Sequence, residues 1–269
     1  MKQLVNRIKY YLRVYFFLVK FNVMDILIYR ANALVMGLAP VVWLTTMLIF
    51  LATIFSQVKT LGGWNFWEIV FLTGVHEVIF LLTWATFLTN LRKFVEEIKT
   101  GRFDQILLKP ISSRFLVSFR NLDFTSVGSL LNAFFVFCFS LGKIIEKIDF
   151  LKIPGFLIFL LVAYFVCYFI YFIFASLSLF FINSKTFIDW VFDATDFDRY
   201  PAEIYTPSLR IFLTFFLPIL FFAYYPTAYL LGKIGEEYLL IGPFLVIGLG
   251  LISHFLWHFG LQHYQSASS

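Results

Sequence analysis

Long apolar stretches alternate with short charged segments along most of the 269-residue chain. A transmembrane helix needs about 20 consecutive, mostly apolar residues. Stretches of this kind predict six spanning helices, at about 31–57, 67–91, 121–142, 154–182, 209–231 and 239–262. Proline at position 154 suits the first turn of the fourth helix. The pattern therefore predicts an all-α, polytopic membrane protein with six transmembrane helices in one domain, 1–269.

The segment before the first span is amphipathic and basic. Its apolar residues recur at helical spacing, with Lys and Arg between them: Leu4, Ile8, Leu12, Tyr15 and Val19. A helix of this kind lies in the headgroup plane with its apolar face toward the acyl chains. We expect an interfacial helix over 1–24, and the alternative is a basic tail that only sets orientation. The basic residues interrupt any short apolar core, so a cleavable signal is not predicted.

Composition and charge agree with a membrane protein. Hydrophobic residues make up 61% of the chain and charged residues 14%, whereas soluble domains are about 25% charged. Sixteen Lys and Arg side chains fall in the N-terminal segment and in the second and fourth connections, against five in the other connections. Because basic loops stay in the cytoplasm, both termini are predicted to be cytoplasmic. The net charge of +5 is thereby explained by topology, and no nucleic-acid partner is expected. Cys138 and Cys167 lie in predicted spans without metal-ligand spacing, so we interpret them as buried thiols.

The connection between the second and third spans contains a compact charged segment, Ile98 to Pro110, with the sequence IKTGRFDQILLKP. Gly101 can end a helix, and Pro110 stops whatever follows. Phe103, Ile106 and Leu107 share one face of a short helix by their spacing. The segment is either a cytoplasmic docking helix for another protein or an ordinary basic loop.

Two ionisable residues, His76 and Glu77, fall inside the second predicted span. An ionisable side chain within the membrane is costly and indicates a functional site or a specific helix contact. Glu77 could contact a substrate, relay protons or pair with another helix. Apart from Arg210 at the start of the fifth predicted span, the predicted spans contain no Lys or Arg, so a hydrogen-bonded carboxyl is expected for Glu77. His254 and His258 share a face of the last span, where a zinc site is possible, but structural histidines are favoured because no carboxylate accompanies them.

The fourth connection, 183–210, is rich in carboxylates: Asp189, Asp193, Asp196, Asp198 and Glu203. It is predicted to be cytoplasmic and partly buried, either as a solvated face or as a second partner contact. Within the fifth span, prolines are expected to kink the helix. Near its outer end, aromatic residues suit the membrane interface, and they are candidates for an outer gate: Tyr224, Tyr225 and Pro226.

Several motifs are missing from the sequence. There is no GxxxxGK[ST] phosphate-binding loop, no HExxH and no GxSxG. ATP binding by a phosphate-binding loop in this chain is therefore not expected. A membrane-embedded enzyme would depend on His76 and Glu77 alone, and a non-transport scaffold is the other alternative.

The segment 98–110 resembles the I-x-x-G-x-x-D-x-x-L-L-x-P pattern of a bacterial branch of the ABC-2 type ABC transporter permeases, formerly classed as a domain of unknown function. Three further segments carry the resemblance, and together the four extend over much of the chain: 200–210, 218–231 and the C-terminal tail 264–269.

The resemblance implies a permease subunit of an exporter in a bacterial inner membrane. The substrate is unidentified, and the aromatic-rich spans suit an amphipathic or hydrophobic one. Two separate ATPase subunits would bind ATP and Mg²⁺, this chain would bind no cofactor, and a second permease, identical or homologous, would complete the pathway among membrane lipids. The ATPase-coupling residues would be Glu97, Thr100, Gly101, Arg102, Phe103, Asp104, Leu107, Leu108 and Pro110. On this view Phe103 and Leu107 supply apolar docking, while Arg102 and Asp104 fix its register.

Overall fold

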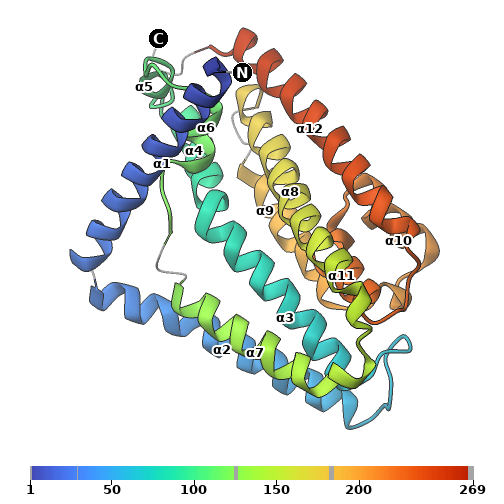
Figure 1. The fold of residues 1–269 in the computed structure, drawn as a ribbon. Coiled ribbons are helices and arrows are strands. Elements are labelled where there is room, and N and C mark those ends of the chain that lie inside the picture. Colours follow the sequence, from blue (N-terminus) through green and yellow to red (C-terminus); the bar gives the residue numbers. More distant parts are fainter. Residues whose placement is uncertain (1, 29, 124–126, 182–184, 266–269) are drawn as a thin grey trace.

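The computed structural model describes residues 2–28, 30–123, 127–181 and 185–265. The described residues form helices and turns, which confirms the all-α part of the predicted fold class, whereas six transmembrane helices and a coupling helix stay predictions. The C-terminal end of α12 (Glu237–His263) lies at the same end of the molecule as the short helices α5 (Asp104–Leu107) and α6 (Ser113–Phe119) (Figure 1). The cytoplasmic location of both termini and of the segment 98–110 stays a prediction.

One long rod forms the centre of the fold. It consists of α3 (Phe66–Thr83), the π-helical turn η1 (Trp84–Leu88) and α4 (Thr89–Lys99). Asn65 caps its N-terminus in a reciprocal capping box with Glu68. At 1.5 Å per residue its 34 residues extend about 51 Å, more than the roughly 30 Å of a bilayer core. The rod is therefore long enough to cross a membrane and still project beyond it.

The other long helices pack around this rod. α7 (Val127–Ile144) lies along α3 and α2 (Arg30–Phe55), and α8 (Ile153–Ser176) lies along α12 (Glu237–His263). In the described part of the chain, four helices are long and apolar enough to cross a membrane, those around α3, α7, α8 and α12. The predicted start of the third span, at residue 121, is wrong, because residues 121–123 are not helical and α7 begins at Val127. Cys138, expected to be buried, is exposed on α7, whereas Cys167 is buried.

The acidic connection does not stay at one end of the molecule. It comprises α9 (Lys185–Ala194) and two 3₁₀ turns, η6 (Thr195–Arg199) and η7 (Ala202–Ile204). Asp189 pairs with Arg92 of α4 at 2.8 Å, and Glu203 accepts a hydrogen bond from Trp64, just before α3, at 3.1 Å. The segment therefore runs antiparallel along the rod from one end to the other. A wholly cytoplasmic connection over 183–210 is a wrong prediction, because ion pairs and hydrogen bonds to the rod allow its acidic residues to lie along α3.

The fifth predicted span, 209–231, is not one helix. Its residues form α10 (Pro207–Ile211), the π turn η8 (Phe212–Phe216), the 3₁₀ turn η9 (Ile219–Phe221) and α11 (Tyr224–Leu230). Pro218 stands at the break, where proline cannot donate a helical hydrogen bond. The two limbs of this hairpin meet again at the hydroxyl pair of Thr214 and Tyr225, 2.9 Å apart. Irregular backbone at membrane depth needs protein around it, and the side chains of η9 are buried.

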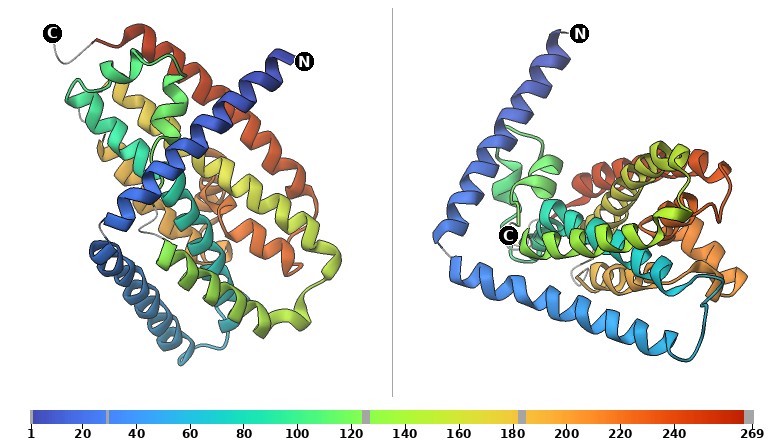
Figure 2. Two further views of the ribbon diagram at one scale, coloured as in Figure 1. Left: turned by 60° about the vertical axis from the view of Figure 1, so that its left-hand side comes forward. Right: turned by 60° about the horizontal axis from the view of Figure 1, so that its bottom comes forward.

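The N-terminal helix α1 (Lys2–Ile28) projects from the bundle (Figure 2). It contacts α6 through the rings of Tyr11 and Phe115, whose centroids are 5.1 Å apart. Asn22 also donates a hydrogen bond to the carbonyl oxygen of Arg120 at 3.4 Å. The predicted N-terminal helix is therefore present over Lys2–Ile28, and its position in the headgroup plane stays a prediction.

Candidate functional site

The segment that joins α4 to α6 forms a tight turn around a glycine. α4 ends at Lys99 with Thr100 as its C-cap, and Gly101 follows with a φ of 71°. The backbone N–H of Phe103 then donates to the carbonyl oxygen of Glu97 at 3.2 Å, which satisfies an end group of the helix. Glycine occupies this left-handed conformation without steric cost. The predicted helix end at Gly101 is confirmed.

The side chains of this segment divide into an inner and an outer set. Phe103 is 0% exposed, and Ile106 is also buried. The Phe103 ring packs on Phe94, Trp257 and Tyr264, with centroids 5.1, 6.1 and 5.2 Å away. By contrast, Leu107 is 41% exposed and Leu108 is 86% exposed. Phe103 therefore belongs to the core and cannot supply the apolar docking surface expected of it, whereas Leu107 and Leu108 can.

The polar residues of the segment are mostly engaged within the chain. Glu97 forms an ion pair with Arg120 at the end of α6. Arg102 donates to the Thr100 hydroxyl at 3.1 Å and is otherwise exposed. Asp104 accepts a hydrogen bond from the Tyr264 hydroxyl, just after α12, at 3.0 Å. The segment is thus fixed to both α6 and the end of α12, so a force applied to it reaches two other elements. Pro110 is exposed and follows the last turn, as expected.

A buried charge cluster lies halfway along α3. His76 Nδ1 is 3.4 Å from the Asp198 carboxylate, and Glu77 forms an ion pair with the Arg199 guanidinium. All four side chains are nearly inaccessible. The second oxygen of Asp198 accepts the backbone N–H of Tyr224 at 3.0 Å. The cluster therefore joins α3, η6 and α11 at one point.

This cluster corrects one expectation for Glu77. Its partner is an arginine from the connection that we expected in the cytoplasm, so the carboxylate is paired rather than merely hydrogen-bonded. Of the roles considered, pairing with another segment is the one that the structure shows. His76 and Glu77 both have charged neighbours, which accounts for them without an enzyme active site.

Sequence reasoning missed Asp198 and Arg199 as the partners of these two residues. A signal was available, since five carboxylates occur within 15 residues of a chain that has only 16 in all. Charged residues gathered between two apolar stretches can lie within the membrane domain when opposite charges face them. The contact of Trp257 with Phe103 was also missed, because an aromatic residue within an apolar helix does not indicate which side chain it packs against.

The outer gate candidates are buried at the other end of the rod. The Tyr224 hydroxyl donates to Glu203 at 2.7 Å. The Tyr225 ring stacks between Phe221 and Tyr238, with centroids at 4.4 and 4.8 Å. Pro226 is buried in the first turn of α11, where its missing N–H breaks no helical bond, so it causes no kink there. The three residues are thus packed within the protein interior, and a role for them in gating stays a prediction.

The rings of His254 and His258 lie 4.1 Å apart on α12. Within the described residues, no group of three or more potential ligands could hold a metal ion. His258 Nδ1 is 2.8 Å from the carbonyl oxygen of His254, which satisfies that nitrogen locally. The pair thus remains without an assigned role.

These observations define a class of protein: a polytopic helical membrane protein in which α4 and α6 are joined by a tight turn that contacts Tyr264, and in which residues 207–230 form a broken helical hairpin. Comparison with family models identifies the family. Residues 41–268 match the ABC-2 family transporter protein, so the chain belongs to this family. No curated protein and no solved structure matches the chain. The resemblance found in the sequence is confirmed. Proteins of this family are membrane-embedded transport components that generally pair with ABC ATPase subunits.

Proposed function

We propose that this chain is the permease subunit of an ABC exporter in the bacterial inner membrane. Two ATPase subunits bind ATP and Mg²⁺ and dock on the segment Glu97–Pro110. A second permease, identical or homologous, completes the pathway for an amphipathic or hydrophobic substrate. The chain crosses the membrane six times with both termini in the cytoplasm, and the fifth crossing is the segment 185–205 rather than 209–231.

The observation that carries this proposal is the division of the segment Glu97–Pro110 into an exposed apolar side and a side packed on α12. We call this segment the docking segment. Two leucines, Leu107 and Leu108, are exposed on a short helix at the end of the longest rod in the fold. Exposed apolar side chains on a rigid element suit a protein contact. The inner face of the same helix packs on α12 through Phe103. A partner that pushes on the leucines therefore acts on α3–α4 and on α12 together.

The mechanism follows from this coupling. ATP binding shifts the permease between two conformations only if the ATPase binds one of them more tightly. The contacts of Phe103 and Asp104 with α12 and Tyr264 transmit movement of the docking helix to the last helix of the bundle. The buried pairs between α3 and η6 hold those two elements in register, so a shift of the rod also moves the irregular crossing.

The test is co-purification from membranes of the native host in mild detergent, with Mg²⁺-dependent ATP hydrolysis as the readout. Leu107→Asp and Leu108→Asp are expected to abolish ATPase activity in the eluate while the permease itself is recovered normally. Leu151→Asp is the matched control, because Leu151 is 88% exposed at the opposite end of the chain's long helices. Equal ATPase recovery with all three variants would contradict docking on this segment.

A further inference from the structure

A groove lies between α2 and the 3₁₀ turns η6 and η7. Three adjoining cavities of about 470, 290 and 430 Å³ make it up, and Asp196 lines all three. On α2 its lining residues run from Trp43 to Ile54, which is about 16 Å at 1.5 Å per residue. The groove is therefore long enough for a molecule with an extended or bulky apolar body.

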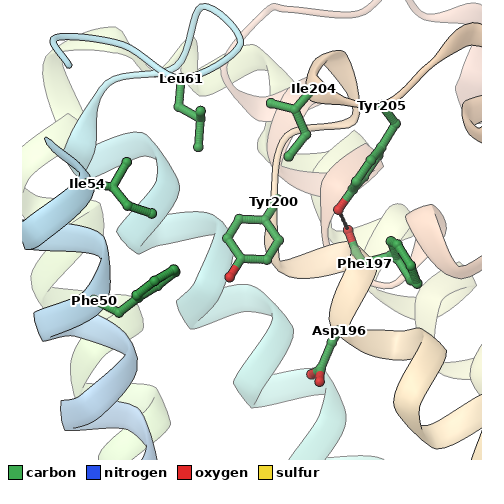
Figure 3. A pocket seen from close by; sticks show the side chains of 8 residues that line it. All are labelled: Phe50, Ile54, Leu61, Asp196, Phe197, Tyr200, Ile204 and Tyr205. Carbon is green, nitrogen blue, oxygen red and sulfur yellow. Dashed lines mark hydrogen bonds between the residues drawn. The ribbon is translucent and has the colours of Figure 1, made fainter. Parts of the chain in front are cut away.

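One end of the groove is apolar. Figure 3 shows Phe50 and Ile54 of α2 on one side, with Tyr200 and Ile204 on the other, and Asp196 at the far end. Apolar and aromatic side chains that surround a cavity favour an apolar ligand body. The sequence from 31 to 58 contains no charged residue, so α2 adds no charge to this wall.

The other end of the groove is charged and aromatic. Two carboxylates, Glu77 and Asp196, share one guanidinium, that of Arg199, whose Nε donates to Asp196 at 2.7 Å. Glu77 and Arg199 are nearly covered, but 57% of the Asp196 side chain is exposed. With α2 uncharged, this end carries one more negative than positive charge.

Aromatic rings complete the charged end: Trp43, Phe80 and Phe192. Ring faces attract cations, and tryptophan attracts them most strongly. The Arg199 guanidinium already lies 5.8 Å from the Trp43 ring centroid, so this ring is close enough to take part in such contacts. Excess negative charge and aromatic faces both favour a positively charged group at this position.

We propose that this groove binds a lipophilic organic cation, with the positive group beside Asp196 and Trp43 and the apolar body between α2 and η7. This assignment rests on the proposed function, because it treats the groove as the site of the transported molecule. Lipid chains or a neutral molecule would satisfy the apolar end only. An anion would meet Asp196 and Glu77 with only one guanidinium to offset them.

The test is equilibrium binding of radiolabelled tetraphenylphosphonium to the purified chain in nanodiscs of neutral lipid, with empty nanodiscs subtracted. Tetraphenylborate is the matched anion, of nearly the same size and shape. We expect saturable binding of the cation and none of the anion. Asp196→Asn should weaken cation affinity about tenfold, since it removes a charge contact in a partly screened site. Asp193→Asn, at an exposed acid outside the groove lining, should leave affinity unchanged.

A second variant guards against an indirect effect of the Asp196 change. Trp43→Ala should weaken cation binding about fivefold, and Val42→Ala, one residue away and outside the lining, should not. Equal binding of the two probes, equal effects of Asp196→Asn and Asp193→Asn, or no saturable binding would each overturn the proposal. A groove filled by a second copy of the chain would give the last result. The assay contains no ATPase, so a lack of cation binding would not contradict docking of the ATPase. Likewise, a failure of the co-purification test would not contradict cation binding.

Discussion

The pairing of Glu77 with Arg199 predicts an unequal response to removing either partner. Arg199 also holds Asp196, at 2.7 Å, so Glu77→Gln leaves the guanidinium with one carboxylate and an amide oxygen that still accepts. The loss is at most that of one charged hydrogen bond, about 1.5–3 kcal/mol. Arg199→Met instead leaves the Glu77 carboxylate buried, with 6% of its side chain exposed and no cation beside it. Breaking a buried pair in this way costs about 3–5 kcal/mol.

The double variant Glu77→Gln with Arg199→Met separates an ion pair from two independent effects. Without the carboxylate at position 77, methionine leaves no unpaired charge at that position, so the double variant should be more stable than Arg199→Met alone. The free energy of unfolding is measured by titration with sodium dodecyl sulfate in mixed micelles. Destabilisation of the double variant by the sum of the single effects would refute the reasoning, because distant, uncoupled residues are additive.

Three further predictions concern the docking segment and the outer hairpin. Gly101→Leu forces a side chain into the left-handed region, at about 1–2 kcal/mol, and should reduce co-purified ATPase activity, whereas Gly248→Leu, in open space on α12, should not. Phe103→Ala should destabilise the chain by about 3–5 kcal/mol in the same detergent titration, while Leu108→Ala should change stability little. Tyr225→Phe removes the hydroxyl pair with η8 and should cost about 1 kcal/mol; no loss in the titration would show that this bond does not hold the hairpin.

Apolar periodicity predicted the helices that cross the molecule without interruption. The stretches at 154–182 and 239–262 correspond to α8 and α12, because an uninterrupted run of about 20 apolar residues is itself enough to predict a spanning helix. The segment 185–205, which we propose as a crossing, was missed for the opposite reason. It contains Asp198 and Arg199, whose charges count against burial unless His76 and Glu77 are known to face them. Sequence alone does not contain that pairing.

The docking segment shows a similar division. Gly101 was predictable from local chemistry, since glycine is needed wherever φ is positive. The orientation of the short helix was not, because four residues have no periodicity of their own. Phe103 and Leu107 are four apart and were assigned to one docking face, but Trp257 and Tyr264 draw Phe103 into the core. Packing against the distant helix α12 thus decided that Phe103 is buried while Leu107 and Leu108 stay exposed.

The most direct test of the account is photo-crosslinking from the tip of the docking segment. Benzoylphenylalanine replaces Leu108 in one variant and Leu151 in another, both highly exposed and at opposite ends of the chain's long helices. Irradiation of native-host membranes should crosslink an ATP-binding subunit to the first variant and not to the second. A crosslink from position 151 alone, or none from position 108, would contradict an ATPase seated on Leu107 and Leu108.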